Sequence, residues 1–116
     1  MSTTAQLDAE LNDAILAGKA MEAFEQYYAD DVVMMENAVA FAGKELNRQR
    51  EVEFFGKLEE FHGVQLVGSA VNGDHSYSEW VYDVTFKGAP RARMEQVAAR
   101  QWKDGQVVHE RFYYKG

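Results

Sequence analysis

Hydrophobic residues recur with a helical period in the first half of the chain and with an alternating period in the second. The first predicted helix begins near Thr3, which fits a capping box with Gln6, and ends at Gly18, a residue suited to a left-handed turn. Its apolar residues lie at every fourth position: Leu7, Leu11 and Ile15. A second helix is predicted at about 19–28 and a third at about 44–60.

The stretch 24–37 predicts the end of an aromatic-faced helix, an acidic turn and a short strand. Asp30 and Asp31 suit the turn because short acidic side chains bond to nearby backbone. Residues 32–35 are apolar enough to form a strand buried on both faces, and Glu36 lies at its end. We interpret residues 37–43 as a short connection. The third helix carries its apolar residues on an inward face: Leu46, Phe54, Phe55 and Leu58.

From Gly63 onward the alternating pattern predicts four strands, at 64–71, 77–86, 91–102 and 106–114. Asn72-Gly73 is a strong hairpin signal, and the single proline, Pro90, breaks the sheet before the third of these strands. Helices followed by an antiparallel meander, with the 32–36 strand at its margin, indicate an α+β fold in one domain spanning residues 1–116.

The turn at residues 103–105 decides which side chains share a face of the last hairpin. A two-residue loop at Asp104-Gly105 would bring Arg100, His109 and Arg111 together, whereas a three-residue turn with Gly105 as a bulge would place Arg100 beside Glu110. We favour the bulge because it pairs opposite charges. The opposite face suits a subunit interface; it would carry Arg93, Glu95, Val97, Ala99, Gln101, Val107, His109, Arg111 and Tyr113.

Composition narrows the classes of partner. A net charge of -7 argues against a nucleic-acid backbone or an anionic membrane as the partner. No apolar run is long enough to span a membrane and no signal peptide is visible, so we expect a cytoplasmic protein. The absence of cysteine excludes disulfides, thiolate zinc sites and a cysteine nucleophile.

Carboxylates and aromatic residues are the candidates for chemistry. Glu36 is either a general base beside an apolar chamber or a strand-end carboxylate bonded to backbone or solvent. Glu110 with Arg100 is either a polar anchor for a ligand or a structural salt bridge. The aromatic residues either line a cavity or fill the core: Tyr27, Phe54, Trp80, Tyr82, Trp102, Phe112 and Tyr114. The spacing of the three histidines favours no metal site, and His62 suits a helix C-terminus.

Three segments carry a resemblance to a known family: Ala17-Gly18-Lys19, residues 28–32 and residues 104–114. Together with the order of elements, they resemble the nuclear transport factor 2-like (cystatin-like) superfamily, and within it the SnoaL-like proteins. The resemblance covers nearly the whole chain. It implies helices packed on a strongly curved, mostly antiparallel sheet that forms a cone with an internal cavity, and a homodimer formed through the outer face of the sheet. Members include isomerases, cyclases, dehydratases and epoxide hydrolases, so the fold alone does not fix the function.

The resemblance transfers catalytic residues only in part. Glu36 falls where the similar ketosteroid isomerases keep their catalytic aspartate, but Leu11 and Ala98 stand at the positions of their oxyanion donors. Epoxide hydrolases of the family use an Asp–Arg–Asp set, for which Arg100 lacks acidic neighbours on its own strand. Glu110 stands near the position of a histidine that is frequent in SnoaL-like cyclases.

These observations leave three hypotheses. The first is a cofactor-free enzyme that acts on a small, largely apolar or aromatic molecule, with isomerase, cyclase or lyase-type acid/base chemistry through Glu36 and with Glu110 and Arg100 orienting a polar substituent. The second is a non-catalytic homodimeric protein whose cavity only holds a ligand. In the third, side chains fill the cavity and dimerisation is the only interaction.

Overall fold

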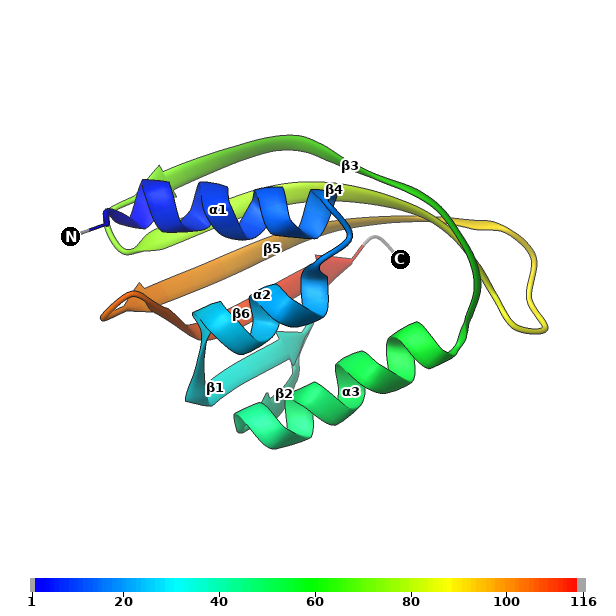
Figure 1. The fold of residues 1–116 in the computed structure, drawn as a ribbon, viewed down its shortest axis with the longest axis horizontal. Helices are drawn as coiled ribbons and strands as arrows, with labels where there is room; N and C mark the ends of the chain where they lie inside the picture. Colours follow the sequence, from blue (N-terminus) through cyan, green and yellow to red (C-terminus); the bar gives the residue numbers. More distant parts are fainter. Residues whose placement is uncertain (1, 115–116) are drawn as a thin grey trace.

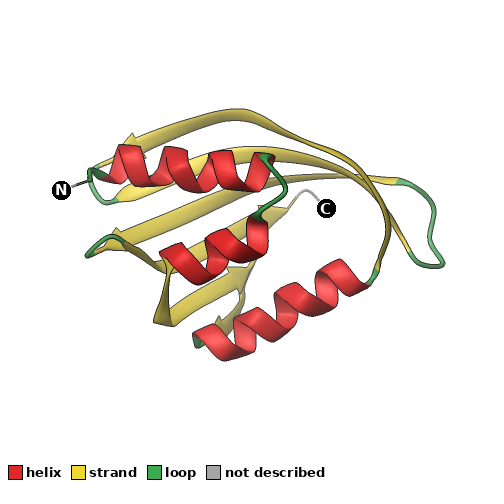
Figure 2. Cartoon of the chain, in the orientation of Figure 1, coloured by secondary structure: helices red, strands yellow, loops and turns green. Residues whose placement is uncertain are grey.

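The computed structural model describes residues 2–114 and shows three helices packed against one six-stranded sheet (Figure 1). In chain order the elements are α1 (Thr4–Leu16), α2 (Ala20–Tyr27), β1 (Tyr28–Glu36), β2 (Val39–Ala42), α3 (Lys44–Gly56), β3 (Leu58–Asn72), β4 (His75–Phe86), β5 (Ala92–Lys103) and β6 (Gln106–Tyr114). The strands lie in the order β2-β1-β6-β5-β4-β3, and all neighbours are antiparallel except β1 and β6. The predicted α+β cone is confirmed, with a sheet that curves around the helices without closing (Figure 2).

The first helix begins and ends as its sequence predicts. The hydroxyl of Thr3 accepts a hydrogen bond from the backbone of Gln6 (3.1 Å), and the Gln6 side chain accepts one from the backbone of Thr3 (2.8 Å). Gly18 follows the helix with a φ of 78°, in the left-handed region that favours glycine.

The junction after α2 differs from the prediction, because β1 begins directly at Tyr28. The ammonium group of Lys44 donates to the carbonyls of Glu25 and Tyr28, both at 2.8 Å, and so satisfies backbone that a turn would otherwise have to satisfy. Asp30 and Asp31 are exposed residues within β1, where the register with β6 shifts, and do not form a turn.

The residues on either side of α3 also form strands that the sequence pattern did not predict. Residues 39–42 form β2, which pairs with β1 and takes the edge position predicted for β1 itself. The helix ends at Gly56, and β3 begins at Leu58 because residues 58–72 pair with β4. Leu46 points outward, with 43% of its surface exposed, whereas Phe55 is 37% exposed and still lines the cavity on the inner face of the sheet. The fully buried residue of α3 is Asn47. Its amide donates to two backbone carbonyls before the helix.

The final hairpin combines the two predicted arrangements. Asp104 and Gly105 form a two-residue loop, with φ values of 53° and 78°. A register shift immediately beyond the loop then places Arg100 opposite Glu110. The predicted pairing of these two residues is therefore confirmed, although the bulge lies in the strands and not in the turn.

The bulge also corrects the predicted faces of β6. Val107, predicted on the outer face, is completely buried in the core, and Val108 is half-buried. The other residues predicted on the outer face of β5 and β6 are exposed or half-buried.

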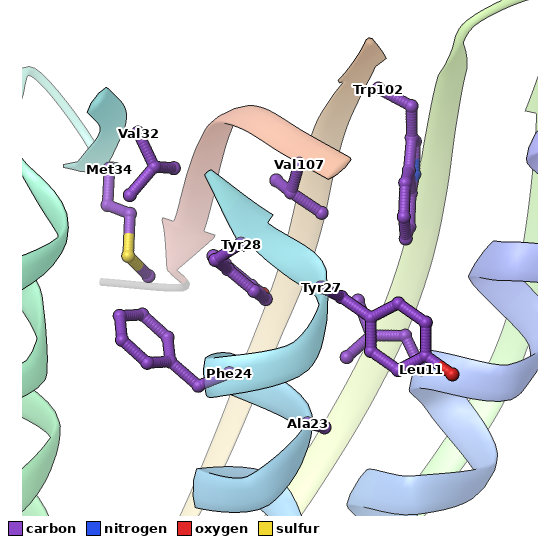
Figure 3. Close-up of a cluster of buried hydrophobic side chains, with 9 residues drawn as sticks. All are labelled: Leu11, Ala23, Phe24, Tyr27, Tyr28, Val32, Met34, Trp102 and Val107. Atoms are coloured by element: carbon purple, nitrogen blue, oxygen red, sulfur yellow. The ribbon is translucent and has the colours of Figure 1, made fainter. Parts of the chain in front are cut away.

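The hydrophobic core lies where α1 and α2 cover the inner face of the sheet (Figure 3). Its buried members come from both helices and from β1, β5 and β6: Leu11, Ala23, Phe24, Tyr27, Tyr28, Val32, Met34, Trp102 and Val107. Phe24 and Tyr28 pack with their ring centroids 4.9 Å apart. No helix within residues 2–114 has the length and apolar character needed to cross a membrane.

Candidate functional site

A cavity of about 500 Å³ lies on the inner face of the sheet, beside the hydrophobic core. Its wall includes residues from all three helices and from β1, β3, β4, β5 and β6. Most of the lining is apolar or aromatic, and a small number of charged and hydroxyl groups reach it. An apolar chamber of this size with few polar groups is typical of a site for a small molecule.

Five of the seven predicted wall aromatics line this cavity: Phe54, Trp80, Tyr82, Phe112 and Tyr114. Tyr27 and Trp102 do not, because α1 and α2 enclose them in the packed core. Tyr27 points toward α1, where its hydroxyl donates to Glu10 at 2.9 Å (Figure 3). The indole N–H of Trp102 donates to the hydroxyl of Ser76 at 3.0 Å.

Glu36 lies on the cavity wall at the end of β1. Its carboxylate pairs with the guanidinium group of Arg50 on α3 at 2.8 Å, and 46% of its side chain is exposed. Arg50 also stacks over the ring of Phe41, 3.5 Å from its centroid. Glu36 is therefore a paired carboxylate at the rim of the cavity.

Arg100 and Glu110 meet at the cavity wall and are almost completely buried. The Nε atom of Arg100 donates to Glu110 at 2.7 Å, and the hydroxyl of Tyr28 donates to the other carboxylate oxygen at 2.6 Å. Burial disfavours the ionised form of Tyr28 and, with the negative charge of Glu110, raises its pKa well above the ordinary value. Tyr28 is thus a protonated donor to Glu110.

The second acid of Arg100 comes from α1, a source that reasoning about strand neighbours missed. Asp8 accepts from Nη1 of Arg100 at 2.9 Å, and Asn12, one turn later, accepts from the same atom at 2.7 Å. An acid–arginine–acid set therefore exists in space, although Asp8 lies behind the cavity wall and does not line it. Burial lowers the pKa of Arg100, but the charges of Glu110 and Asp8 outweigh this effect and raise it.

Two serines of β4 complete the network. Ser76 donates to Asp8 at 2.6 Å, and Ser78 accepts from the amide of Asn12 at 3.0 Å. All of these groups are buried and all have partners, as buried polar groups require. The only sequence signal for Asp8 is its place in the helix that carries Leu7, Leu11 and Ile15.

Glu51 is the candidate that the sequence analysis missed. It lies on α3, one turn after the buried Asn47, and it lines the cavity. Burial raises its pKa to about 7, and the negative charges of Glu110 and Glu36 contribute, while Arg50 opposes them. Within residues 2–114 its carboxylate forms no hydrogen bond and no ion pair. The polar sequence of α3, with no clear apolar stripe, hides this residue.

Two tyrosine hydroxyls add donors to the cavity. Burial and the neighbouring carboxylates raise the pKa of Tyr82 and that of Tyr114 above the ordinary value. Both phenols are therefore protonated at neutral pH and able to donate a hydrogen bond to a ligand oxygen. With Glu36 and Glu51, the cavity holds proton donors and proton acceptors among apolar walls, which is the composition that acid/base chemistry needs.

The three histidines are dispersed in the structure. His62, predicted to cap a helix, lies in β3 and hydrogen-bonds to the hydroxyl of Thr85 at 2.8 Å. His75 is the first residue of β4, and His109 lies in β6. In the described part of the chain, no group of three or more histidine, aspartate or glutamate side chains is arranged to hold a metal ion.

Comparison with known proteins gives one family and several similar structures. A family model for the SnoaL-like domain matches residues 2–114. A protein from Mesorhizobium loti, named for its likeness to SnoaL-like polyketide cyclases, is 31% identical with a TM-score of 0.87, over 97% of this chain and 100% of that one. A protein from Catenulispora acidiphila with a ketosteroid isomerase-like fold, solved in complex with trimethylamine, is 21% identical with a TM-score of 0.76, over 92% of this chain and 84% of that one. A similarly named polyketide cyclase-like protein from Jannaschia is 14% identical with a TM-score of 0.82, over 97% of this chain and 85% of that one. No curated protein matches the sequence.

Proposed function

The chain belongs to the SnoaL-like family of the nuclear transport factor 2-like superfamily, and we propose that it binds a small, largely apolar or aromatic molecule in its cavity. The observation that carries this proposal is the cavity of about 500 Å³, which remains beside a well-packed core and is lined by aromatic rings. A protein that needed this space only for stability would fill it, because an unfilled apolar volume costs free energy.

We further propose that bound ligand undergoes cofactor-free acid/base chemistry of the isomerase, cyclase or lyase type. Glu36 would move the proton, since it lies on the wall with a carboxylate that solvent and ligand can both reach. Glu110 and Arg100 would orient a polar substituent, held in place by Asp8 and Tyr28 behind them. The protonated hydroxyls of Tyr82 and Tyr114 replace, as hydrogen-bond donors, the oxyanion groups that Leu11 and Ala98 cannot supply.

Proton exchange tests this chemistry before a natural substrate is identified. In D₂O, the protein should speed deuterium incorporation next to the carbonyl of 1-phenylpropan-2-one, followed by proton NMR. Glu36→Gln should abolish the enhancement and leave ligand binding intact, whereas Glu53→Gln, an exposed change on α3, should keep the wild-type rate. An unchanged rate in Glu36→Gln would remove Glu36 from the proposal.

A second candidate is a non-catalytic homodimer whose cavity only stores or presents its ligand. It is favoured by the outer face of the sheet, where Tyr77, Tyr113 and Val67 expose between 42% and 51% of their surface. The Nε atom of Arg111, on β6, is buried there without a hydrogen-bond partner among the described residues. A second copy could cover this face. Under this alternative, sedimentation equilibrium would show a dimer that Tyr113→Glu dissociates. The exchange assay would show no deuterium incorporation above the solvent rate.

A further inference from the structure

The charges that line the cavity do not balance. Four carboxylates reach its wall, from Glu22, Glu36, Glu51 and Glu110, against two guanidinium groups, from Arg50 and Arg100. Arg50 is paired with Glu36, and Arg100 is paired with Glu110 and also with Asp8. Glu22 is exposed to solvent. Among residues 2–114, Glu51 is therefore the carboxylate of the cavity wall that is half-buried and forms no ion pair.

The buried carboxylates Glu110 and Asp8 differ from Glu51 because each accepts hydrogen bonds from neighbouring side chains. Glu110 is buried with two donors, and Asp8 accepts from both Arg100 and Ser76. Glu51 is half-buried on the cavity wall with no donor among the described residues, and this apolar setting disfavours its ionised form. Residues 2–114 supply no hydrogen-bond or ion-pair partner for this group, and a ligand in the cavity would be able to supply one.

The rings around Glu51 suit a cation. Tyr28, Tyr82 and Tyr114 all lie close enough to Glu51 for its charge to disfavour their ionisation. Together with Phe54, on the next turn of α3, they provide the electron-rich faces that attract ammonium groups. The same surplus of negative charge repels a carboxylate or phosphate ligand, because a confined apolar cavity strengthens the field of its charges.

We propose that the cavity selects a small organic cation, an ammonium nitrogen attached to apolar or aromatic carbon, and that Glu51 is the carboxylate that receives its charge. This inference rests on the proposed ligand-binding function and names the class of ligand. Glu51 is a specificity-determining residue in this scheme, while Glu36, Glu110 and Arg100 keep the roles given above.

The arrangement makes binding depend on pH in a defined direction. The charged and titratable groups around Glu51 are Arg50 on its own helix, Glu36 and Tyr28 on β1, Tyr82 on β4, and Glu110 and Tyr114 on β6. At pH values below its pKa of about 7, Glu51 is mostly neutral, so a cation must displace its proton on binding. The affinity for a ligand of fixed positive charge should therefore rise about tenfold between pH 6 and pH 8 and level off above.

Three probes of similar shape and different charge test the proposal: benzyltrimethylammonium, benzyl alcohol and benzoate. Each is titrated into the protein while the indole signal of Trp80 and the methyl signals of Met34 and Met94, all on the cavity wall, are followed by NMR. We expect benzyltrimethylammonium to bind at least tenfold more tightly than benzyl alcohol at pH 8 and benzoate to bind most weakly. Calorimetry in buffers of different ionisation enthalpy should show proton release with the cation at pH 7.

Two variants separate the specific effect from a general change of charge. Glu51→Gln should lose both the preference for the cation and the pH dependence but still bind benzyl alcohol, whereas Glu53→Gln, the same change on the exposed side of the helix, should keep both. Equal binding of the cation and the alcohol, or a preference that survives in Glu51→Gln, would overturn the proposal and leave the cavity function standing. Failure of all three probes to shift the wall signals would overturn the cavity function itself, and the proposal with it.

Discussion

The inner face of the sheet carries two regions that differ in whether their polar groups have partners within the protein. Where α1 and α2 cover it, side chains fill the space, and a buried charged network joins Arg100 to Asp8, Asn12 and Glu110. Where α3 spans it, a cavity remains, and the carboxylate of Glu51 lines it without a partner among residues 2–114. Figure 1 shows the three helices side by side over this face, with α3 nearest to β1 and β2.

The difference distinguishes polar groups that are satisfied within the fold from one that is not. Of the buried side-chain polar atoms in residues 2–114, the only one without a partner is Nε of Arg111, on β6. The network under α1 is therefore complete without any ligand. In the cavity region, Glu36 is paired with Arg50, whereas Glu51 has no partner among residues 2–114; the proposed ligand would supply one.

The largest effect is expected from breaking the complete network. Arg100→Met would leave Asp8 and Glu110 buried without their cation, and removing one partner of a buried pair typically costs 3–5 kcal/mol. We expect a loss of about 5 kcal/mol in the free energy of unfolding, measured in urea. Arg93→Met, which removes an exposed guanidinium from the same strand, should change it by less than about 0.5 kcal/mol. A loss under about 1 kcal/mol for Arg100→Met would contradict the account of the network.

A matched pair of truncations sharpens the comparison of packing. Phe24 has 3% of its surface exposed and lies in the filled core, so Phe24→Ala should cost about 3–4 kcal/mol. Phe54 lines the cavity and is half-buried, so Phe54→Ala should cost roughly half as much, while it weakens the binding of aromatic probes. Urea unfolding and NMR titration of each variant measure both quantities. Equal losses of stability would show that the two regions are packed alike.

A smaller effect, of opposite sign, is expected at Glu51. Its pKa is raised from 4.5 to about 7 in the folded protein, so the folded state binds the extra proton and stability from this group falls as pH rises from about 4.5 to 7. Since tenfold in proton affinity is worth about 1.4 kcal/mol, Glu51→Gln should gain up to about 3 kcal/mol over the wild type at pH 8 relative to pH 5. Glu53→Gln should show no such trend. A gain in stability that is the same at both pH values would refute the predicted direction of the pH dependence.

The alternating pattern of the second half of the chain predicted the faces of the sheet well. The period of two residues fixes which side chains face inward, so the pairing of Arg100 with Glu110 and the inward direction of four cavity aromatics followed from sequence: Trp80, Tyr82, Phe112 and Tyr114. The predicted face of Val107 was wrong because a single extra residue in the strand moves the side chains beyond it to the opposite face of the sheet.

The residues that escaped prediction depend on tertiary contact. Asp8 meets Arg100 across 92 positions of sequence, and no local pattern distinguishes it from a solvent-exposed residue of the helix. Glu51 lies in a helix with no clear apolar stripe, so its inward direction appears only when α3 is placed against β1 and β2. The strand at 39–42 is too short to show a period and forms because β1 offers it an edge.

The central claim is that the cavity wall carries a half-buried carboxylate, Glu51, with no partner among residues 2–114. The most direct test is a titration of the glutamate side-chain carboxyl carbons by NMR. Comparison with Glu51→Gln assigns the signal of Glu51, and Glu53 in the same spectrum provides a solvated reference. The account predicts that Glu51 titrates at about 7 and that benzyltrimethylammonium moves this value downward. A value near the ~4.3 of a glutamate in water would contradict it, because Glu51 would then have solvent as its partner.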